Sequence, residues 1–169
     1  KIDYKMNKNI LINYLNVMFL DYSTRDERYI QFAAEQAVKS NVLTFRHGCI
    51  AVVSGKIVAR GYNNTRTYSK DGFIKNTCSC HAETDVLRKC YKQNINKKII
   101  LYIARISKKN TLLNSEPCVE CFNLMKELNV KYIIYSTENS ITKIHVNHFE
   151  PKHHSSGFQA IQNERVTLL

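Results

Sequence analysis

The spacing of apolar residues changes from a helical to an alternating pattern within the first third of the chain. Between residues 26 and 40 it predicts an amphipathic helix whose buried face holds Ile30, Ala33, Ala34, Ala37 and Val38. Thr24 and Glu27 form a capping box just before this face. Two apolar strands follow, at residues 48–53 and 56–62, and the Ser54-Gly55 pair between them predicts a tight hairpin turn.

The rest of the chain alternates between helical and strand patterns. We predict helices and strands in the order helix 82–92, strand 98–106, helix 119–128, strand 131–136, turn 137–140, strand 143–148 and helix 155–166. The strand KYIIYS is almost continuously apolar, as strands at the centre of a parallel sheet are. The order of elements predicts an α/β fold, a three-layer α-β-α sandwich around a mixed five-stranded sheet.

The length of 169 residues fits a single domain. We divide it into an N-terminal extension or helix (1–24), a core (26–136) and a C-terminal hairpin and helix (137–169). The apolar run at 10–20 is interrupted by asparagines and is shorter than the roughly 20 residues that a bilayer requires, so it predicts a docking helix and no membrane contact. No signal-peptide cleavage site follows it, and we expect an intracellular, cytoplasmic protein with reduced cysteines.

The chain is strongly basic, with 25 Lys and Arg against 14 Asp and Glu and a formal net charge of +11. This excess favours an anionic partner, either a nucleotide or a nucleic acid such as RNA or single-stranded DNA. Lysine and asparagine are frequent along the whole chain, however, and codon bias explains the same excess. The charge therefore suggests a class of partner without deciding the fold.

Two short motifs stand at the predicted starts of two helices. His81-x-Glu83 opens the first, and Pro117-Cys118-x-x-Cys121 opens the second. Both helices follow strand–loop connections, so their N-termini can converge at one edge of the sheet. The two cysteines are three residues apart and share one helix face, and a helix N-terminus favours the thiolate form.

One imidazole and two thiolates give three protein ligands, the number typical of catalytic zinc, whose fourth position takes water. Zinc lowers the pKa of such a water from ~16 towards ~7. Glu83 is not needed as a ligand, so it can take the proton of the water and return it to a ring nitrogen and then to a leaving amine. The alternative is a zinc that only joins the two helices, although a closed site prefers four protein ligands.

The two motifs match the H-x-E…P-C-x-x-C signature of the zinc deaminases, and the chain resembles the cytidine deaminase superfamily. The resemblance covers about residues 26–136 and follows the family's order: HGCIAVVSGKIVARGYN, HAETDVL, LYIARI, NSEPCVECF and VKYIIYS. It implies a cytidine deaminase-like fold, a Zn²⁺ cofactor held by His81, Cys118 and Cys121, and Glu83 as the catalytic residue. Relatives assemble as dimers, tetramers or hexamers, so it also implies a homo-oligomer.

The resemblance implies substrate contacts as well. Asn63, which ends the GYN segment, matches a position that hydrogen-bonds the nucleoside or base, although a turn residue after a strand is almost as good an explanation. The backbone of Ala82 is expected to face the base, and that of Ser115 and Glu116 to line the pocket near the departing ammonia. The Glu116 side chain is better explained as a carboxylate at a helix start than as a catalyst.

A basic loop with aromatic residues leads from the hairpin into the first motif. Arg66 and Lys70 can hold a phosphate, and Tyr68 can stack on a base, but a plain solvated loop has the same composition. Arg105, near the end of the strand at 98–106, is either a second phosphate contact or an exposed edge residue.

Further cysteines and histidines invite a metal interpretation. Cys78-x-Cys80 and His47-x-Cys49 are candidates for a second, structural zinc, which some deoxycytidylate deaminases carry, but packing in the core or in a loop explains them better. Four histidines near the C-terminus are expected to be scattered over the surface: His145, His148, His153 and His154.

The favoured substrate is dCMP or CMP, ahead of the free pyrimidine nucleoside, because an anionic substrate suits the basic loop. Two alternatives stay open: editing of C or A in RNA or single-stranded DNA, and a basic zinc module that binds nucleic acid without turnover. The short turn at 137–140 is a departure. Deoxycytidylate and tRNA-editing relatives usually place a helix before a parallel last strand, whereas an antiparallel hairpin here would resemble the cytidine and blasticidin branch.

Overall fold

The protein is described by a computed structural model that covers residues 25–42, 44–75 and 77–166. The elements are α2 (Arg25–Ala37), β1 (Arg46–Val53), β2 (Lys56–Tyr62), α3 (Ala82–Lys92), β3 (Ile99–Ile106), β4 (Leu112–Leu113), α4 (Val119–Glu127), β5 (Val130–Ser136), β6 (Ile141–His145), a 3-10 turn (Val146–His148) and α5 (Ser156–Gln162). The helix expected at 10–20 and the capping residue Thr24 lie outside the described residues. Within the described ranges, no helix is long and apolar enough to cross a membrane.

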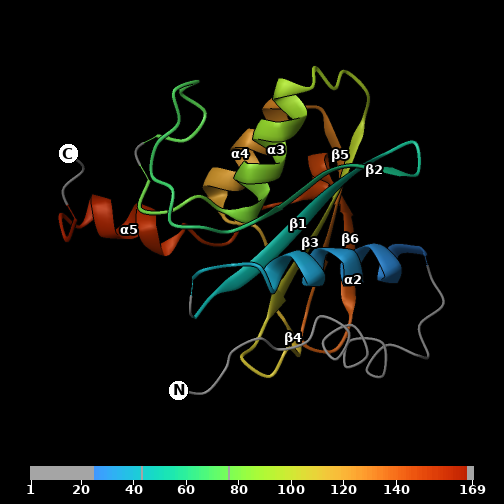
Figure 1. Cartoon of the computed structure of the whole chain (residues 1–169), viewed down its shortest axis with the longest axis horizontal. Coiled ribbons are helices and arrows are strands. Elements are labelled where there is room, and N and C mark those ends of the chain that lie inside the picture. The colour runs from blue at the N-terminus through green and yellow to red at the C-terminus, as the bar shows by residue number, and fades with distance from the viewer. Residues whose placement is uncertain (1–24, 43, 76, 167–169) are drawn as a thin grey trace, which may run out of the picture.

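The strands form one mixed sheet in the order β2-β1-β3-β5-β6, and the short β4 pairs with β3 outside this path (Figure 1). β3 and β5 run parallel, and the other described pairings are antiparallel. The predicted α/β class and its five main strands are confirmed. β4 is a sixth strand that the pattern did not predict, because two residues are too few to show alternation. The hairpin predicted around 137–140 is confirmed, since β6 returns antiparallel to β5.

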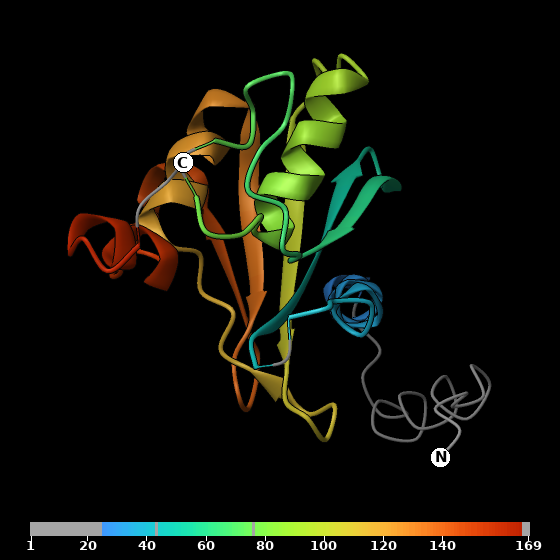
Figure 2. The ribbon, with the colours of Figure 1, turned by 60° about the vertical axis from the view of Figure 1, so that its left-hand side comes forward.

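Helices cover both faces of the sheet (Figure 1, Figure 2). α2 packs on one face, where Ile30 shares a buried cluster with Tyr102. α3 and α4 pack on the other face, where Val86 shares a cluster with Leu101. Leu101 and Tyr102 are neighbours in β3 and serve opposite cores because successive strand residues point to opposite faces. This alternation decides which strand residues can reach the α3 and α4 side.

Two local features fix the position of β1. A Cβ atom at Gly48 would overlap the carbonyl oxygen of Ala33 and the amide nitrogen of Ala37, so only glycine lets α2 lie this close to the strand. At the other end of β1, Ser54 and Gly55 have φ angles of 49° and 77°. Two successive left-handed residues are typical of a tight hairpin turn, as the sequence predicted.

Candidate metal centre

α3 and α4 begin close together, and each begins with a predicted metal ligand. His81 is the N-cap residue of α3, and Cys118 is the N-cap residue of α4. An N-cap side chain usually accepts a hydrogen bond from the free amides of its helix, but neither of these does so. Both side chains are therefore available to another partner, as is Cys121 in the first turn of α4.

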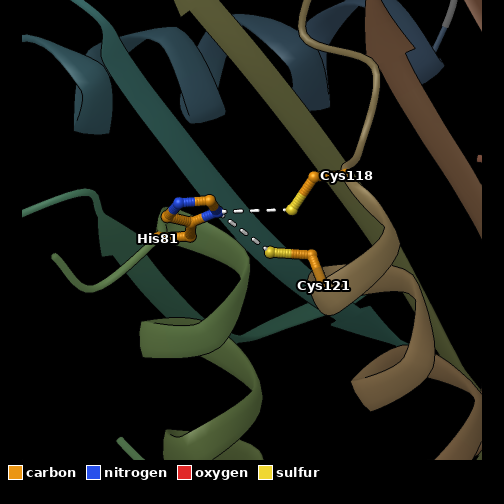
Figure 3. A group of neighbouring side chains, drawn as sticks. All are labelled: His81, Cys118 and Cys121. Carbon is orange, nitrogen blue, oxygen red and sulfur yellow. Dashed lines mark hydrogen bonds between the residues drawn. The ribbon is translucent and has the colours of Figure 1, made fainter. Parts of the chain in front are cut away.

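The three donor atoms are arranged as zinc ligands are (Figure 3). Nδ1 of His81 lies 3.3 Å from Sγ of Cys121 and 3.6 Å from Sγ of Cys118, and all three atoms lie within 4.8 Å of one another. Tetrahedral zinc with ordinary Zn–N and Zn–S bond lengths separates nitrogen from sulfur by about 3.6 Å. The residues present thus fit a zinc ion.

A second cluster of this kind is not found among the described residues. Cys49 and Cys80 are buried, and the Cys80 thiol donates a hydrogen bond to the carbonyl oxygen of His81 at 3.5 Å. The packing role expected for these cysteines agrees with their burial.

Local charges favour cation binding at the three ligands. The pKa of Cys118 is lowered to about 6, mainly by a hydrogen bond from Cys121 and also by His81, although burial opposes this. The pKa of Cys121 is raised, because its thiol is the donor to Cys118 and because it is buried. Burial opposes the charge on His81 as well, but Cys118 and Glu83 raise its pKa to about 9. A divalent cation that displaces the protons of His81 and Cys121 would balance the negative charges of the thiolates and of Glu83.

Glu83 lies directly beside the ligands, in the first turn of α3. Only 5% of its surface is exposed. Within the described residues, its carboxylate takes part in no ion pair and accepts no side-chain hydrogen bond. A buried carboxylate without a protein partner is costly, and such groups concentrate at functional sites.

One pocket of about 400 Å³ brings these groups together, and its volume is in the range of small-molecule sites. Its lining includes six of the residues predicted from the sequence: Asn63, His81, Ala82, Glu83, Glu116 and Cys118. The chemical centre and the expected base-binding positions therefore face the same space.

Comparison with known proteins decides the family. The sequence pattern of the cytidine and deoxycytidylate deaminase zinc-binding region matches residues 23–137, which is more than half of the chain. The chain belongs to the cytidine and deoxycytidylate deaminase family.

Individual members of the deaminase family are distant. A deoxycytidylate deaminase of Schizosaccharomyces pombe is 26% identical over 128 residues, covering 66% of this chain and 37% of that protein. A tRNA-specific adenosine deaminase subunit of the same yeast is 30% identical over 122 residues, covering 70% of this chain and 27% of that protein. The chain thus spans well under half the length of these relatives. A cytidine deaminase structure from Burkholderia pseudomallei shares the fold, with a TM-score of 0.56 at 15% identity, covering 77% of this chain and 98% of that chain.

Asn63 holds the pocket wall in place. Its Nδ2 donates to the carbonyl oxygen of Phe45 at 2.6 Å, and its Oδ1 accepts from the amide of His47 at 2.8 Å. Both ends of the side chain are thus bound to the start of β1. These two hydrogen bonds fit the interpretation of Asn63 as a turn residue after a strand. Asn63 also lines the pocket, as the interpretation as a base contact requires.

Ser115 is buried and is not part of the pocket lining. Its hydroxyl donates to the carbonyl oxygen of Ile103 at 2.8 Å and lies 2.9 Å from Oγ of Ser136. It therefore joins β3 to β5 just before the Cys118 motif. Glu116 does line the pocket, and its carboxylate lies 3.9 Å from the Lys152 ammonium.

The basic loop does not bring its predicted contacts into the pocket. Arg66, Tyr68 and Lys70 are exposed, Tyr68 by 66%, and none of them lines the pocket. The loop is nevertheless well fixed: Ser69 is buried, and its Oγ donates to Asp71 at 2.6 Å. These exposed side chains lie outside the space that the metal ligands share.

The C-terminal segment 153–157 is part of the pocket wall, and sequence analysis did not foresee this. It contacts the cysteine motif and the loop just before His81. The amide of Val119 donates to the carbonyl oxygen of His153 at 3.0 Å, and the Cys78 thiol donates to that of Gly157 at 3.6 Å. The carboxylate of Glu120 accepts from the Ser155 amide at 2.9 Å and binds the His154 ring at 2.6 Å. No motif marks this segment, because only the folded chain brings it to the metal ligands.

Proposed function

We propose that the protein is a zinc-dependent hydrolytic deaminase that converts a cytosine nucleotide or nucleoside, with dCMP or CMP favoured, to the uracil form and ammonia. The observation that carries this proposal is Glu83, a buried carboxylate that lines the pocket together with His81 and Cys118 and has no hydrogen-bond or ion-pair partner among the described residues. A zinc that only joins two helices has no use for such a group. A hydrolytic reaction needs it, because protons must move beside the metal.

Zinc held by His81, Cys118 and Cys121 would lower the pKa of a water molecule towards ~7 and so supply a nucleophile at neutral pH. Glu83 accepts one proton of the attacking water and delivers it to the ring nitrogen N3 of the cytosine. It then carries the second proton of that water to the amino group, which leaves as ammonia, while the oxygen stays on the ring. The backbone at Ala82 and the wall held by Asn63 position the base beside this carboxylate.

The preference for a monophosphate has support from two sides. The curated relatives include deoxycytidylate deaminases, and the pocket lining contains an arginine, Arg105. The antiparallel β6 resembles the cytidine branch instead. A strand direction at the sheet edge does not set the charge of a pocket, however, so we give more weight to the cation.

Released ammonia tests the proposal directly. A panel of cytidine, deoxycytidine, their monophosphates, adenosine and single-stranded oligonucleotides should show fastest release from dCMP or CMP. Glu83→Gln should lower the rate at least ~100-fold, the lower range for general acid–base catalysis, while zinc content stays unchanged. Glu127→Gln, at the exposed far end of α4, is the matched control. Turnover that survives Glu83→Gln, or a zinc-loaded protein that deaminates nothing in the panel, would contradict the proposal.

A nucleic-acid editing activity is the second candidate. It is favoured by the exposed Arg66, Tyr68 and Lys70 on a fixed loop and by the similarity to a tRNA-specific adenosine deaminase subunit. An editor with six or more phosphate contacts should lose ~1,000-fold in affinity between about 50 and 200 mM salt, and a mononucleotide enzyme much less. Salt-dependent binding without ammonia release would instead support the non-catalytic zinc module.

We also propose an intracellular, cytoplasmic location, because the six cysteines are free and two of them are needed as metal ligands. Assembly as a homo-oligomer stays a prediction from the family resemblance. Light scattering on the purified protein would give the number of subunits.

A further inference from the structure

The guanidinium of Arg105 has an N–H group that is buried without a hydrogen-bond acceptor. Its Nε is the one buried side-chain nitrogen or oxygen in the described part of the chain that lacks a hydrogen-bond partner. Arg105 also forms no ion pair with any described residue. Buried donors are partnered in roughly 90% of cases or more, and arginine does not lose its proton in proteins. Such a group requires an explanation. Nε itself is closed to solvent, but an anion bound by the Nη atoms of the same guanidinium would balance its charge.

Arg105 belongs to the wall of the same pocket as the metal ligands His81 and Cys118. It lies in β3, two residues after Ile103, which packs in the core below α3 and α4. The register of the sheet pairs it with His47 of β1, which also lines the pocket. Because paired and alternate residues share one face, Arg105 faces the side of the sheet that carries the metal centre.

No other charged group of the described pocket wall forms an ion pair with Arg105. Glu83 is committed to the metal centre, and Glu116 lies 3.9 Å from Lys152. Burial lowers the pKa of His47, so this neighbour is neutral at physiological pH and adds no second cation. Arg105 is therefore the permanent positive charge among the residues that line the pocket.

An aromatic ring supports the guanidinium from one side. The Cζ atom of Arg105 lies 4.8 Å from the centroid of the Phe45 ring. Phe45 is 52% exposed and lines the pocket as well. A ring against one face of a guanidinium holds it by a cation–π contact and leaves its N–H edges free. The edge formed by the two Nη atoms matches two oxygens of a phosphate group, which a guanidinium can bind through two parallel hydrogen bonds.

We propose that Arg105, supported by Phe45, binds the 5′-phosphate of a free cytosine nucleotide and sets the preference for the monophosphate over the nucleoside. This inference rests on the proposed function and adds the residue that selects the substrate. The pocket favours a single nucleotide over a polynucleotide, because its 400 Å³ is bordered by the C-terminal segment 153–157 and the cations of the basic loop lie outside it.

Kinetics with paired substrates test this role. Arg105→Gln should lower kcat/KM for dCMP roughly 10- to 100-fold, as expected for the loss of charge-assisted hydrogen bonds, mainly through KM. The value for deoxycytidine should change less than about threefold, since this substrate has no phosphate. Arg105→Lys keeps the charge but loses the planar guanidinium, so its kcat/KM for dCMP should fall between those of the wild type and Arg105→Gln. Arg28→Gln, exposed on the helix that covers the other face, should change neither substrate.

A binding measurement separates this inference from the proposed function. Calorimetric titration of the Glu83→Gln protein with dCMP and with deoxycytidine requires no turnover. Adding Arg105→Gln should weaken dCMP binding by the same 10- to 100-fold and leave deoxycytidine binding unchanged. Equal losses for both ligands, no loss for dCMP, or a loss seen only with a single-stranded oligonucleotide would overturn the phosphate site. If the wild-type protein deaminates nothing, the proposed function fails, and the titration still decides whether Arg105 binds phosphate.

Discussion

Replacing Glu120 with glutamine should loosen the pocket wall without disturbing the fold. The Glu120 carboxylate binds the ring of His154 at 2.6 Å and the amide of Ser155 at 2.9 Å. These two hydrogen bonds outweigh burial and lower its pKa to about 2. A glutamine can accept one of the two bonds through its oxygen, but its amide group then meets the other donor. The side chain is 32% exposed, so we expect a loss of about 1–2 kcal/mol, at the lower end for charged hydrogen bonds.

Native-state hydrogen exchange measures this loss where it occurs. A change of about 1–2 kcal/mol raises the local opening constant roughly 5- to 30-fold. The amides of Ser155 and Phe158 should exchange faster by that factor, because Phe158 depends on the Ser155 hydroxyl at 3.1 Å. The amide of Ile103 in the central strand β3 should be unchanged. Substrate affinity is a poorer readout. Only molecules whose pocket wall is open lose affinity, and they remain a small fraction of the total.

Glu127→Gln provides the control, because it makes the same change at the exposed end of the same helix. It should leave the exchange of all three amides as in the wild type. Unchanged exchange at Ser155 in Glu120→Gln would show that the carboxylate does not hold the segment. Faster exchange at Ile103 by the same factor would show that the substitution destabilises the whole protein instead.

Three further predictions concern the fold and the metal. Gly48→Ala should cost about 3 kcal/mol or more in urea unfolding, because the new Cβ would overlap backbone atoms of α2. Asp26→Asn removes the carboxylate charge that the Tyr102 hydroxyl binds at 2.6 Å and the Lys143 ammonium at 2.8 Å, and should cost about 1 kcal/mol at neutral pH. The pKa of Asp26 is lowered in the folded state, where hydrogen bonds from Lys143 and Tyr102 outweigh burial, so this difference should be present above its ordinary value of 3.8 and disappear as the pH falls through the folded pKa. Cys121→Ser should abolish stoichiometric zinc after dialysis, whereas Cys80→Ser, at a buried thiol outside the ligand group, should retain it.

The sequence predicted what depends on local spacing. The hairpin at Ser54-Gly55 and the two ligand motifs each lie within a few residues, and local backbone rules are enough to place them on a turn or at a helix start. The three predicted ligands lie together because the two helix starts meet, which the order of strands and helices made predictable.

The pocket wall depends on tertiary contacts that no spacing encodes. Arg105 carried two interpretations in the sequence, a phosphate contact or an edge residue, because a strand pattern gives the face but not the neighbour. Only the register with His47 and the ring of Phe45 put it in the pocket. In segment 153–157 the sequence showed only two histidines, which we expected to be scattered on the surface and not to line a pocket. Arg66 looked as suitable for a phosphate contact as Arg105, because the two arginines differ in burial and burial cannot be read from the sequence.

The metal centre and the pocket wall are built from different parts of the fold, and we propose that this separates the chemistry from the choice of substrate. The ligands stand at the starts of α3 and α4, whose positions follow from the sheet itself. The wall comes from the start of β1, from the end of β3 and from the C-terminal segment 153–157. This segment is bound by the carboxylate of Glu120, which stands between the two cysteine ligands in the sequence. A change in Arg105 or in that segment can alter which molecule enters without moving a ligand. The chain is similar both to relatives named for deoxycytidylate and to one named for tRNA adenosine, and we expect its pocket wall to decide which substrate it accepts.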